Sequence, residues 1–129
     1  MIKSGLLNPA VLQLLARIRH TNTLIIADRG FPFWPQIETV DISLIDDVPT
    51  VLQVLDAIRA NFVIGRAYVA TEFKTNNDPA TQAALATRFK KIPLIFEPHL
   101  ELKKRVPHAI GLIRTGGTIQ YSNLIIESA

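Results

Sequence analysis

The chain has 129 residues, of which 48% are hydrophobic, so it is long enough to form one domain with a sizeable core. It contains no cysteine, which excludes disulfides and thiolate zinc sites, and no uncharged apolar run is long enough to span a membrane. The net charge of +3 comes with only two small basic clusters and no interleaving of aromatic and basic residues, which argues against a nucleic-acid partner. The first residues lack the features of a secretory signal, so we expect one cytoplasmic domain over residues 1–129.

The first half of the chain predicts one helix and two extended segments. Asparagine and proline at residues 8–9 are typical of an N-cap and a first helical position, and they predict a helix that ends near Arg19. The short apolar run at residues 24–27 predicts a central strand that is covered on both faces. Two prolines within residues 31–36 predict a loop, and residues 38–44 predict a short strand or an extended piece.

The second half of the chain alternates helices and strands. The predicted helices begin at Pro49, Asp78-Pro79 and Pro98, and the last two reach roughly Lys90 and Arg105. The predicted strands lie at residues 62–71, 94–96, 110–114 and 124–126, with Gly116-Gly117 in the turn between the last two. This alternation predicts an α/β fold, a single domain whose mostly parallel sheet is flanked by helices on both faces. Ligands of such sheets bind outside the carboxyl ends of the strands.

Candidate functional residues interrupt the apolar segments at the predicted strand ends. They are Asp28, Glu72, Lys74, Tyr121 and Asn123. His20 lies at a helix end, where a protonated imidazole is stabilised by the helix dipole, so this histidine has a purely structural explanation as well. Asp28 has one too, because a carboxylate after a strand often forms the next turn.

Aromatic residues are concentrated directly after Asp28, where three of them fall within residues 31–34. This segment either packs against the core or forms the wall of a pocket for a small polar ligand. The three histidines, His20, His99 and His108, do not have the i, i+4 spacing or the carboxylate companion of a zinc site. Phosphate-binding, dinucleotide-binding and nucleophile-elbow motifs are absent from the sequence, so we expect no metal and no nucleotide or acyl-transfer chemistry.

Four short segments, taken together, resemble the D-ribose pyranase and L-fucose mutarotase family (RbsD/FucU). They are His20-Thr21, residues 26–28 with Gly30 and Pro32, residues 113–116, and residues 121–123. The similarity runs from about residue 7 to residue 126, with helices and strands in the same order. Members of this family interconvert cyclic forms of free sugars without a cofactor or a metal.

The resemblance implies a role for six residues. The histidine that matches His20 transfers the proton, and the residues that bind the sugar are those that match Asp28, His99, Tyr121 and Asn123. A lysine that matches Lys103 is contributed across a subunit boundary. Members form pentameric rings that often stack as decamers, so we expect a homo-oligomer with a monosaccharide site at each subunit boundary.

The chemistry of the family suits these residue types. Opening a hemiacetal removes a proton from the anomeric hydroxyl and gives one to the ring oxygen, and an imidazole with an ordinary pKa of about 6.5 can do either. We therefore expect His20 and Asp28 to reach one cleft. His99, Thr21 and Lys103 follow the ribose branch of the family, whereas Phe31 is closer to the fucose branch, so D-ribose or another pentose is the favoured substrate.

Three departures from the family pattern allow a changed substrate or a lost activity. Asn22 replaces an aspartate, Arg29 places a permanent cation beside Asp28, and the chain stops at Ala129 without the usual hydrophobic tail. The alternative function is a non-catalytic sugar-binding or transport-accessory protein on the same scaffold. A third possibility is a structural ring that binds no small molecule.

Overall fold

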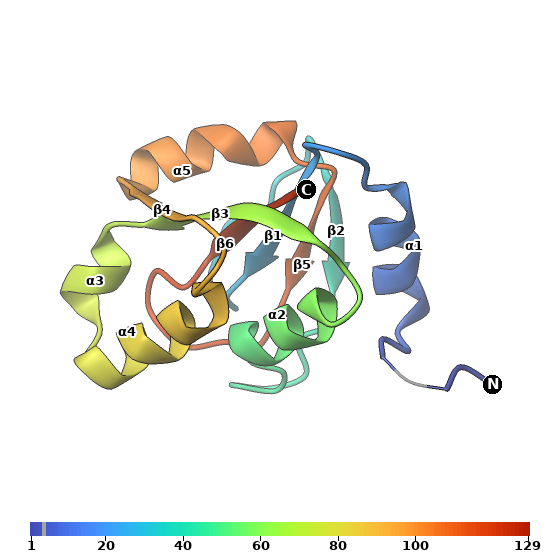
Figure 1. Cartoon of the computed structure of the whole chain (residues 1–129), viewed down its shortest axis with the longest axis horizontal. Helices are drawn as coiled ribbons and strands as arrows, with labels where there is room; N and C mark the ends of the chain where they lie inside the picture. The colour runs from blue at the N-terminus through green and yellow to red at the C-terminus, as the bar shows by residue number, and fades with distance from the viewer. Residues whose placement is uncertain (4) are drawn as a thin grey trace.

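Six strands form one sheet, in which five strands run parallel to one another and the last runs antiparallel (Figure 1). The computed structural model describes residues 1–3 and 5–129. The order of the strands is β2-β5-β1-β6-β3-β4. Their bounds are β1 Thr23–Ala27, β2 Glu38–Asp41, β3 Ile64–Ala70, β4 Leu94–Glu97, β5 Gly111–Arg114 and β6 Leu124–Ser128. The predicted mostly parallel sheet is confirmed.

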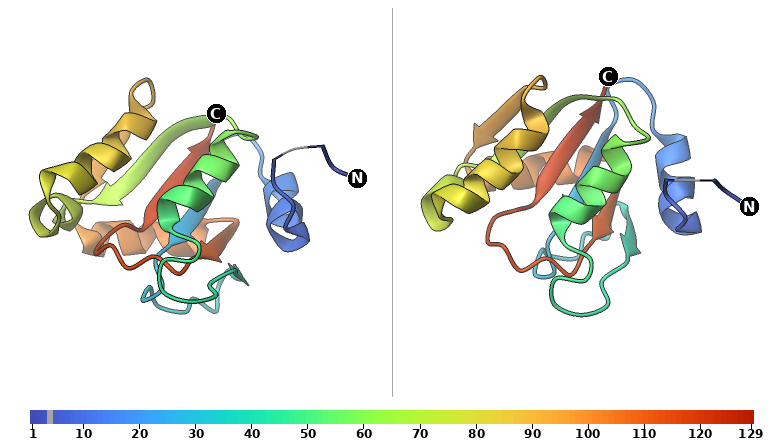
Figure 2. Two further views of the ribbon diagram at one scale, coloured as in Figure 1. Left: turned by 90° about the horizontal axis from the view of Figure 1, so that it is seen from below. Right: turned by 60° about the horizontal axis from the view of Figure 1, so that its bottom comes forward.

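Helices cover both faces of this sheet, as predicted. Their bounds are α1 Pro9–Arg17, α2 Val51–Arg59, α3 Glu72–Asn76, α4 Pro79–Ala86 and α5 His99–Arg105, with 3-10 turns η1 Thr87–Phe89 and η2 Val106–His108. Figure 2 shows α2 and α4 in front of the strands and α5 behind them. None of the helices in the described part of the chain is long and apolar enough to cross a membrane.

Strand β1 is the centre of the core, as its uniformly apolar sequence predicts. It pairs with β5 on one side and with β6 on the other. Alternate side chains point to opposite faces, so Leu24 and Ile26 pack with α1, α2 and α4, whereas Ile25 and Ala27 pack with α5. All four are buried on both faces of the sheet, which explains the absence of polar alternation in this strand.

Local hydrogen bonds explain where the helices begin. The side chains of Asn8 and Asp78 cap α1 and α4, each accepting from a backbone N–H three residues on. The helix predicted from Pro49 instead begins at Val51, because Thr50 and Gln53 form a reciprocal capping box.

Other predicted bounds also differ from those observed. The helix predicted to reach Arg19 ends at Arg17, and the one predicted to reach Lys90 continues beyond Ala86 only as the turn η1. The strand predicted over residues 62–71 is shorter, and the unpredicted helix α3 follows it directly. Helix α3 lacks a side-chain cap, which removes the usual sequence signal for a helix start.

The topology brings several loops to one edge of the sheet. The carboxyl ends of the five parallel strands share this edge, and the antiparallel strand β6 begins there. Residues 28–32, 71–72, 98–99 and 121–123 therefore leave or enter the sheet at the same edge. At the opposite edge, the backbone of Thr21 and Asn22 forms hydrogen bonds with Ser128.

Candidate functional site

A cavity of about 430 Å³ lies at the carboxyl edge of the sheet. Its volume is within the range of small-molecule sites. Three loops line it, those that follow β1 and β4 and the one that precedes β6. The lining residues named in the argument below are Asp28, Gly30, Phe31, His99, Tyr121 and Asn123. The position agrees with the general rule for ligands of open α/β sheets.

Asp28 is held by hydrogen bonds to its backbone and to both of its carboxylate oxygens. Its N–H donates to Oδ1 of Asn123 (2.8 Å), and Nδ2 of Asn123 donates to Oδ2 of Asp28 (3.1 Å). The N–H of Gly30 donates to Oδ1 of Asp28 (2.9 Å). Asn123 is only 4% exposed, so it presents its amide mainly to Asp28. The carboxylate therefore enters the cavity in a fixed orientation, with acceptor capacity left for a ligand hydroxyl.

Arg114, at the end of β5, holds the loop that carries Asp28. Its Nη1 donates to the carbonyls of Asp28 and Arg29 (3.3 Å each), and its Nη2 donates to the carbonyl of Pro32 (3.2 Å). The guanidinium of Arg29 forms a salt bridge with Asp46 (2.6 Å). This side chain therefore turns towards the loop after β2 and pairs with a carboxylate other than that of Asp28.

The segment of residues 113–116 has a structural reason for its composition. Oγ1 of Thr115 donates to the carbonyl of Ala27 (2.8 Å) and accepts from the N–H of Gly117 (3.0 Å). A Cβ on Gly116 would lie 2.2 Å from the carbonyl oxygen of Ile45, a distance that no side chain tolerates. The contacts of Thr115 fix the end of β5 against β1, and Gly116 lets the loop after β2 approach closely.

His99 begins α5 and is positioned by a neighbouring helix. Its backbone N–H donates to Oε2 of Glu72 on α3 (2.8 Å). Its ring stands edge-on to Tyr121, with 5.2 Å between centroids, and lies 6.3 Å from the ring of Phe31. Burial, followed by the Lys103 cation, lowers the pKa of His99, against smaller opposite effects of Glu72 and Asp28. These surroundings therefore favour the neutral form of the imidazole.

The turn before β6 presents Tyr121 and Asn123 to the cavity. Tyr121 has a φ of 55°, a left-handed conformation that is uncommon for an aromatic residue. Oγ of Ser122 closes the turn by donating to the carbonyl of Ile119 (2.8 Å), and Nδ2 of Asn77 donates to the carbonyl of Gln120 (2.9 Å). Such conformations are often held at ligand sites.

The aromatic segment after Asp28 both packs against the core and forms part of the cavity wall, the two alternatives that its sequence suggested. Phe31 belongs to the core beside α5 and also lines the cavity, and Trp34 packs against it with 6.0 Å between ring centroids. Phe33 is 72% exposed and takes part in neither. Phe31 thus gives the cavity an apolar wall next to the carboxylate of Asp28.

His20 does not lie in this cavity. It is exposed in the turn that precedes β1, whereas Asp28 directly follows β1, so the two residues lie at opposite ends of one strand. A five-residue strand spans about 16 Å at about 3.3 Å per residue. The expectation that one chain brings His20 and Asp28 into one cleft is therefore wrong. Asn22, whose Oδ1 accepts from the N–H of Arg19 (2.9 Å), shapes this turn instead of the cavity.

Lys103 lies one helical turn after His99 on α5 and acts electrostatically on it within the same chain. The structure thus brings together Asp28, His99, Tyr121 and Asn123, with Lys103 close by. The sequence singled out Glu72 without giving it a role. In the structure its carboxylate accepts a hydrogen bond from the backbone N–H of His99. Sequence reasoning missed Arg114 as a support of the loop, since the contacts of this residue reach back more than 80 positions in the chain.

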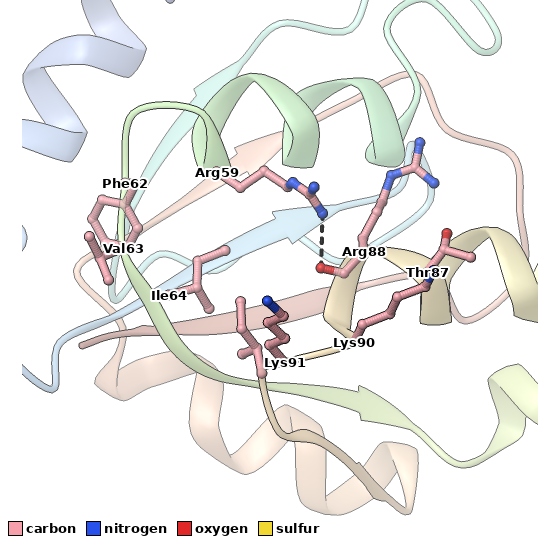
Figure 3. Close-up of a pocket in the computed structure, with 9 residues that line it drawn as sticks. Arg59, Phe62, Val63, Ile64, Thr87, Arg88, Lys90 and Lys91 are labelled. Atoms are coloured by element: carbon pink, nitrogen blue, oxygen red, sulfur yellow. Dashed lines mark hydrogen bonds between the residues drawn. The ribbon is translucent and has the colours of Figure 1, made fainter.

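A second cavity, of about 560 Å³, lies between the end of α2, the start of β3 and the turn η1 (Figure 3). Arg59 and Arg88 line it together with Lys90 and Lys91. Arg88 forms a bidentate pair with Asp56 (2.8 Å for both bonds), and Arg59 donates to the carbonyl of Arg88 (2.8 Å). No carboxylate or imidazole lines this cavity in the described part of the chain.

Metal ligation does not account for either cavity. Within residues 1–3 and 5–129, no group of three or more histidine, aspartate or glutamate side chains is arranged to hold a metal ion.

Comparison with known proteins identifies close relatives over the full length of the chain. The model of the RbsD / FucU transport protein family matches residues 1–129. The D-ribose pyranase of Geobacillus thermodenitrificans is 36% identical over 99% of this chain and 96% of its own length. That of Chromobacterium violaceum is 38% identical over 99% and 97%.

Solved structures agree with this result. Bacillus subtilis RbsD, solved in complex with D-ribose, superposes with a TM-score of 0.93 at 27% identity, covering 100% of this chain and 98% of that one. The fucose mutarotase of Streptococcus pneumoniae, solved with L-fucose, has a TM-score of 0.80 at 15% identity over 95% and 92% of the two chains, and this likeness concerns the fold alone.

Proposed function

Because this chain belongs to the RbsD / FucU transport protein family, we propose that it catalyses the interconversion of cyclic forms of a free monosaccharide, with D-ribose as the favoured substrate. The observation that carries the proposal is the cavity at the carboxyl edge of the sheet. It combines a fixed carboxylate, an imidazole and an aromatic wall in a fold that matches a ribose-bound protein. Full-length relatives named D-ribose pyranase support the same substrate.

The residues of the cavity suit a sugar ring. Asp28 accepts hydrogen bonds from sugar hydroxyls, while the faces of Phe31 and Tyr121 pack on the apolar face of the ring. Ring opening and closure then need only proton transfer and orientation, because the open-chain form already occurs in solution. Proton transfer by a positioned side chain typically contributes about 10²–10⁴-fold, so the reaction requires no cofactor.

We further propose that His20 transfers a proton in a site that a second copy of the chain completes. The family resemblance gives His20 this role, and the length of β1 keeps it away from Asp28 of its own chain. Two exposed apolar side chains support a covering subunit, since Phe33 and Leu100 are each 72% exposed and directly follow Pro32 and His99, which line the cavity. Closed homo-oligomers such as the expected pentameric ring repeat one such contact around a symmetry axis.

The second candidate is a sugar-binding or transport-accessory protein on the same scaffold. The description of the family as a transport protein family favours it. A binder and an enzyme share the cavity but differ in their need for His20.

Exchange NMR of the purified protein with ribose, fucose and other aldoses tests the proposal. An active enzyme broadens the NMR signals of the ring forms of its substrate, or transfers saturation from the signal of one ring form to that of another. Binding without faster exchange would favour the second candidate, whereas the absence of both binding and exchange would contradict the two together.

A further inference from the structure

Opening a cyclic hemiacetal moves protons at two oxygens of the same carbon. A base takes the proton of the anomeric hydroxyl while an acid supplies one to the ring oxygen, and a single imidazole cannot start in both protonation states. Two groups are therefore better suited than one. Histidine is the side-chain type that ordinarily titrates near neutral pH, and among the described residues that line the cavity His99 is the only histidine.

The ring of His99 is held in position by its neighbours, but one of its nitrogens has no hydrogen-bond partner in the described part of the chain. Glu72 fixes the backbone at His99, and the rings of Phe31 and Tyr121 fix its imidazole. Nε2 of His99 is nevertheless buried without a hydrogen-bond partner among the described residues. Buried polar atoms are ordinarily paired, so an unpaired nitrogen in a cavity wall marks a position that a ligand satisfies.

The charges around His99 come from three elements. Lys103 lies on the same helix, Glu72 reaches it from α3, and Asp28 faces it from the loop after β1, while Tyr121 packs on it from the turn before β6. Burial and Lys103 outweigh the two carboxylates, so the pKa of His99 lies below its usual value. A neutral imidazole has one nitrogen that can accept a proton.

On the premise of the proposed function, we propose that His99 is a second catalytic residue, the base that takes the proton of the anomeric hydroxyl. As the O–H electrons form the new carbonyl, the bond between C1 and the ring oxygen breaks. The electron pair of that bond goes to the ring oxygen, which receives a proton from the imidazole of His20 of a neighbouring copy. Closure through another hydroxyl, or on the other face of the carbonyl, runs the same transfers in reverse.

Two variants separate proton transfer from hydrogen bonding. His99→Asn and His99→Gln place an amide near Nδ1 and Nε2 respectively, and neither amide can take up a proton. We expect each variant to lower the rate of ring-form exchange by about 10²–10⁴-fold. The sugar dissociation constant should change by less than about tenfold, the value of one ordinary hydrogen bond. His108→Gln, an exposed histidine outside the cavity, is the matched control and should keep the wild-type rate.

The pH dependence of the exchange rate distinguishes a catalytic role of His99 from a purely structural one, because a structural role would leave its shape unchanged. In the wild type, the exchange rate should fall in acid, where His99 becomes protonated, and both variants should lose this acid limb. If the two variants keep the wild-type rate and acid limb, or if loss of sugar binding accounts for their whole loss of rate, the inference is overturned while the proposed function stands. A wild type that exchanges no faster than buffer would overturn the proposed function itself.

Discussion

Asp28 and Asn123 hold each other through two hydrogen bonds of opposite direction. The N–H of Asp28 donates to Oδ1 of Asn123, and Nδ2 of Asn123 donates back to Oδ2 of Asp28. The two residues are 95 positions apart, one at the end of β1 and the other at the start of the neighbouring antiparallel strand β6. This pair therefore ties the carboxylate of the site to the centre of the sheet.

Replacing Asn123 should disturb both the fold and the site. In Asn123→Ala, the backbone N–H of Asp28 loses its partner, and leaving such a group unsatisfied costs about 1–3 kcal/mol of the free energy of unfolding. Sugar affinity should fall as well, because the carboxylate loses its fixed orientation. Thermal or denaturant unfolding and calorimetric titration with ribose measure the two effects. Asn61→Ala, an exposed amide outside the cavity, is the control, and an equal effect there would contradict the assignment.

Replacing Asp28 distinguishes a ligand-binding carboxylate from a turn-former. Hydrogen bonds from sugar hydroxyls to a carboxylate contribute about 1.5–3 kcal/mol each, so Asp28→Ala should weaken sugar binding strongly. Some stability is lost too, because Oδ1 of Asp28 accepts from the N–H of Gly30. Titration and thermal unfolding of the same variant compare the two losses. Full sugar affinity together with a lower melting temperature would show that Asp28 is a turn-former only.

Replacing Lys103 should shift the acid limb of the activity. The cation of Lys103 disfavours protonation of His99 and so lowers its pKa. In Lys103→Met the pKa of His99 rises, and the rate of ring-form exchange should begin to fall at a higher pH than in the wild type. Lys104→Met is the control, because Lys104 pairs with Glu101 at the surface (2.7 Å). Identical pH profiles for the wild type and the Lys103 variant would exclude this coupling.

Replacing His20 should separate rate from binding. His20 is exposed, and its turn is held by backbone hydrogen bonds of Thr21 and Asn22, so His20→Ala should leave the melting temperature nearly unchanged. Ring-form exchange should fall by about 10²–10⁴-fold, while most of the sugar affinity remains with Asp28 and the other residues of the cavity. A variant that exchanges ring forms at the wild-type rate would remove His20 from the mechanism.

The parts of the fold that depend on local pattern could be predicted from the sequence. The apolar run of β1 identified the central strand, and Asn8 and Asp78 identified two helix starts, because caps and burial leave a mark within a few residues. Helix α3 has no such mark. Its start follows β3 directly and lacks a side-chain cap.

Only those residues of the candidate site that lie directly at strand ends could be predicted from the sequence pattern. Asp28, Tyr121 and Asn123 were recognisable because they interrupt apolar runs at the carboxyl edge of the sheet. The separation of His20 from Asp28 was predictable as well, because the strand predicted over residues 24–27 lies between them and an extended strand keeps its two ends apart. The support that Arg114 gives to the loop after β1 instead depends on contacts between distant parts of the chain.

Mixed assemblies of two inactive variants test the central claim, that sugar ring forms interconvert in a site shared by Asp28 of one copy and His20 of another. Co-expressed His20→Ala and Asp28→Ala chains should recover about a quarter of the wild-type exchange rate for ribose, because each intact half-site is present in about half of the copies of a symmetric ring. Chains that carry both substitutions, mixed with His20→Ala chains, should recover nothing. A mixture of the single variants that stays inactive, beside an active wild type, would contradict the shared site.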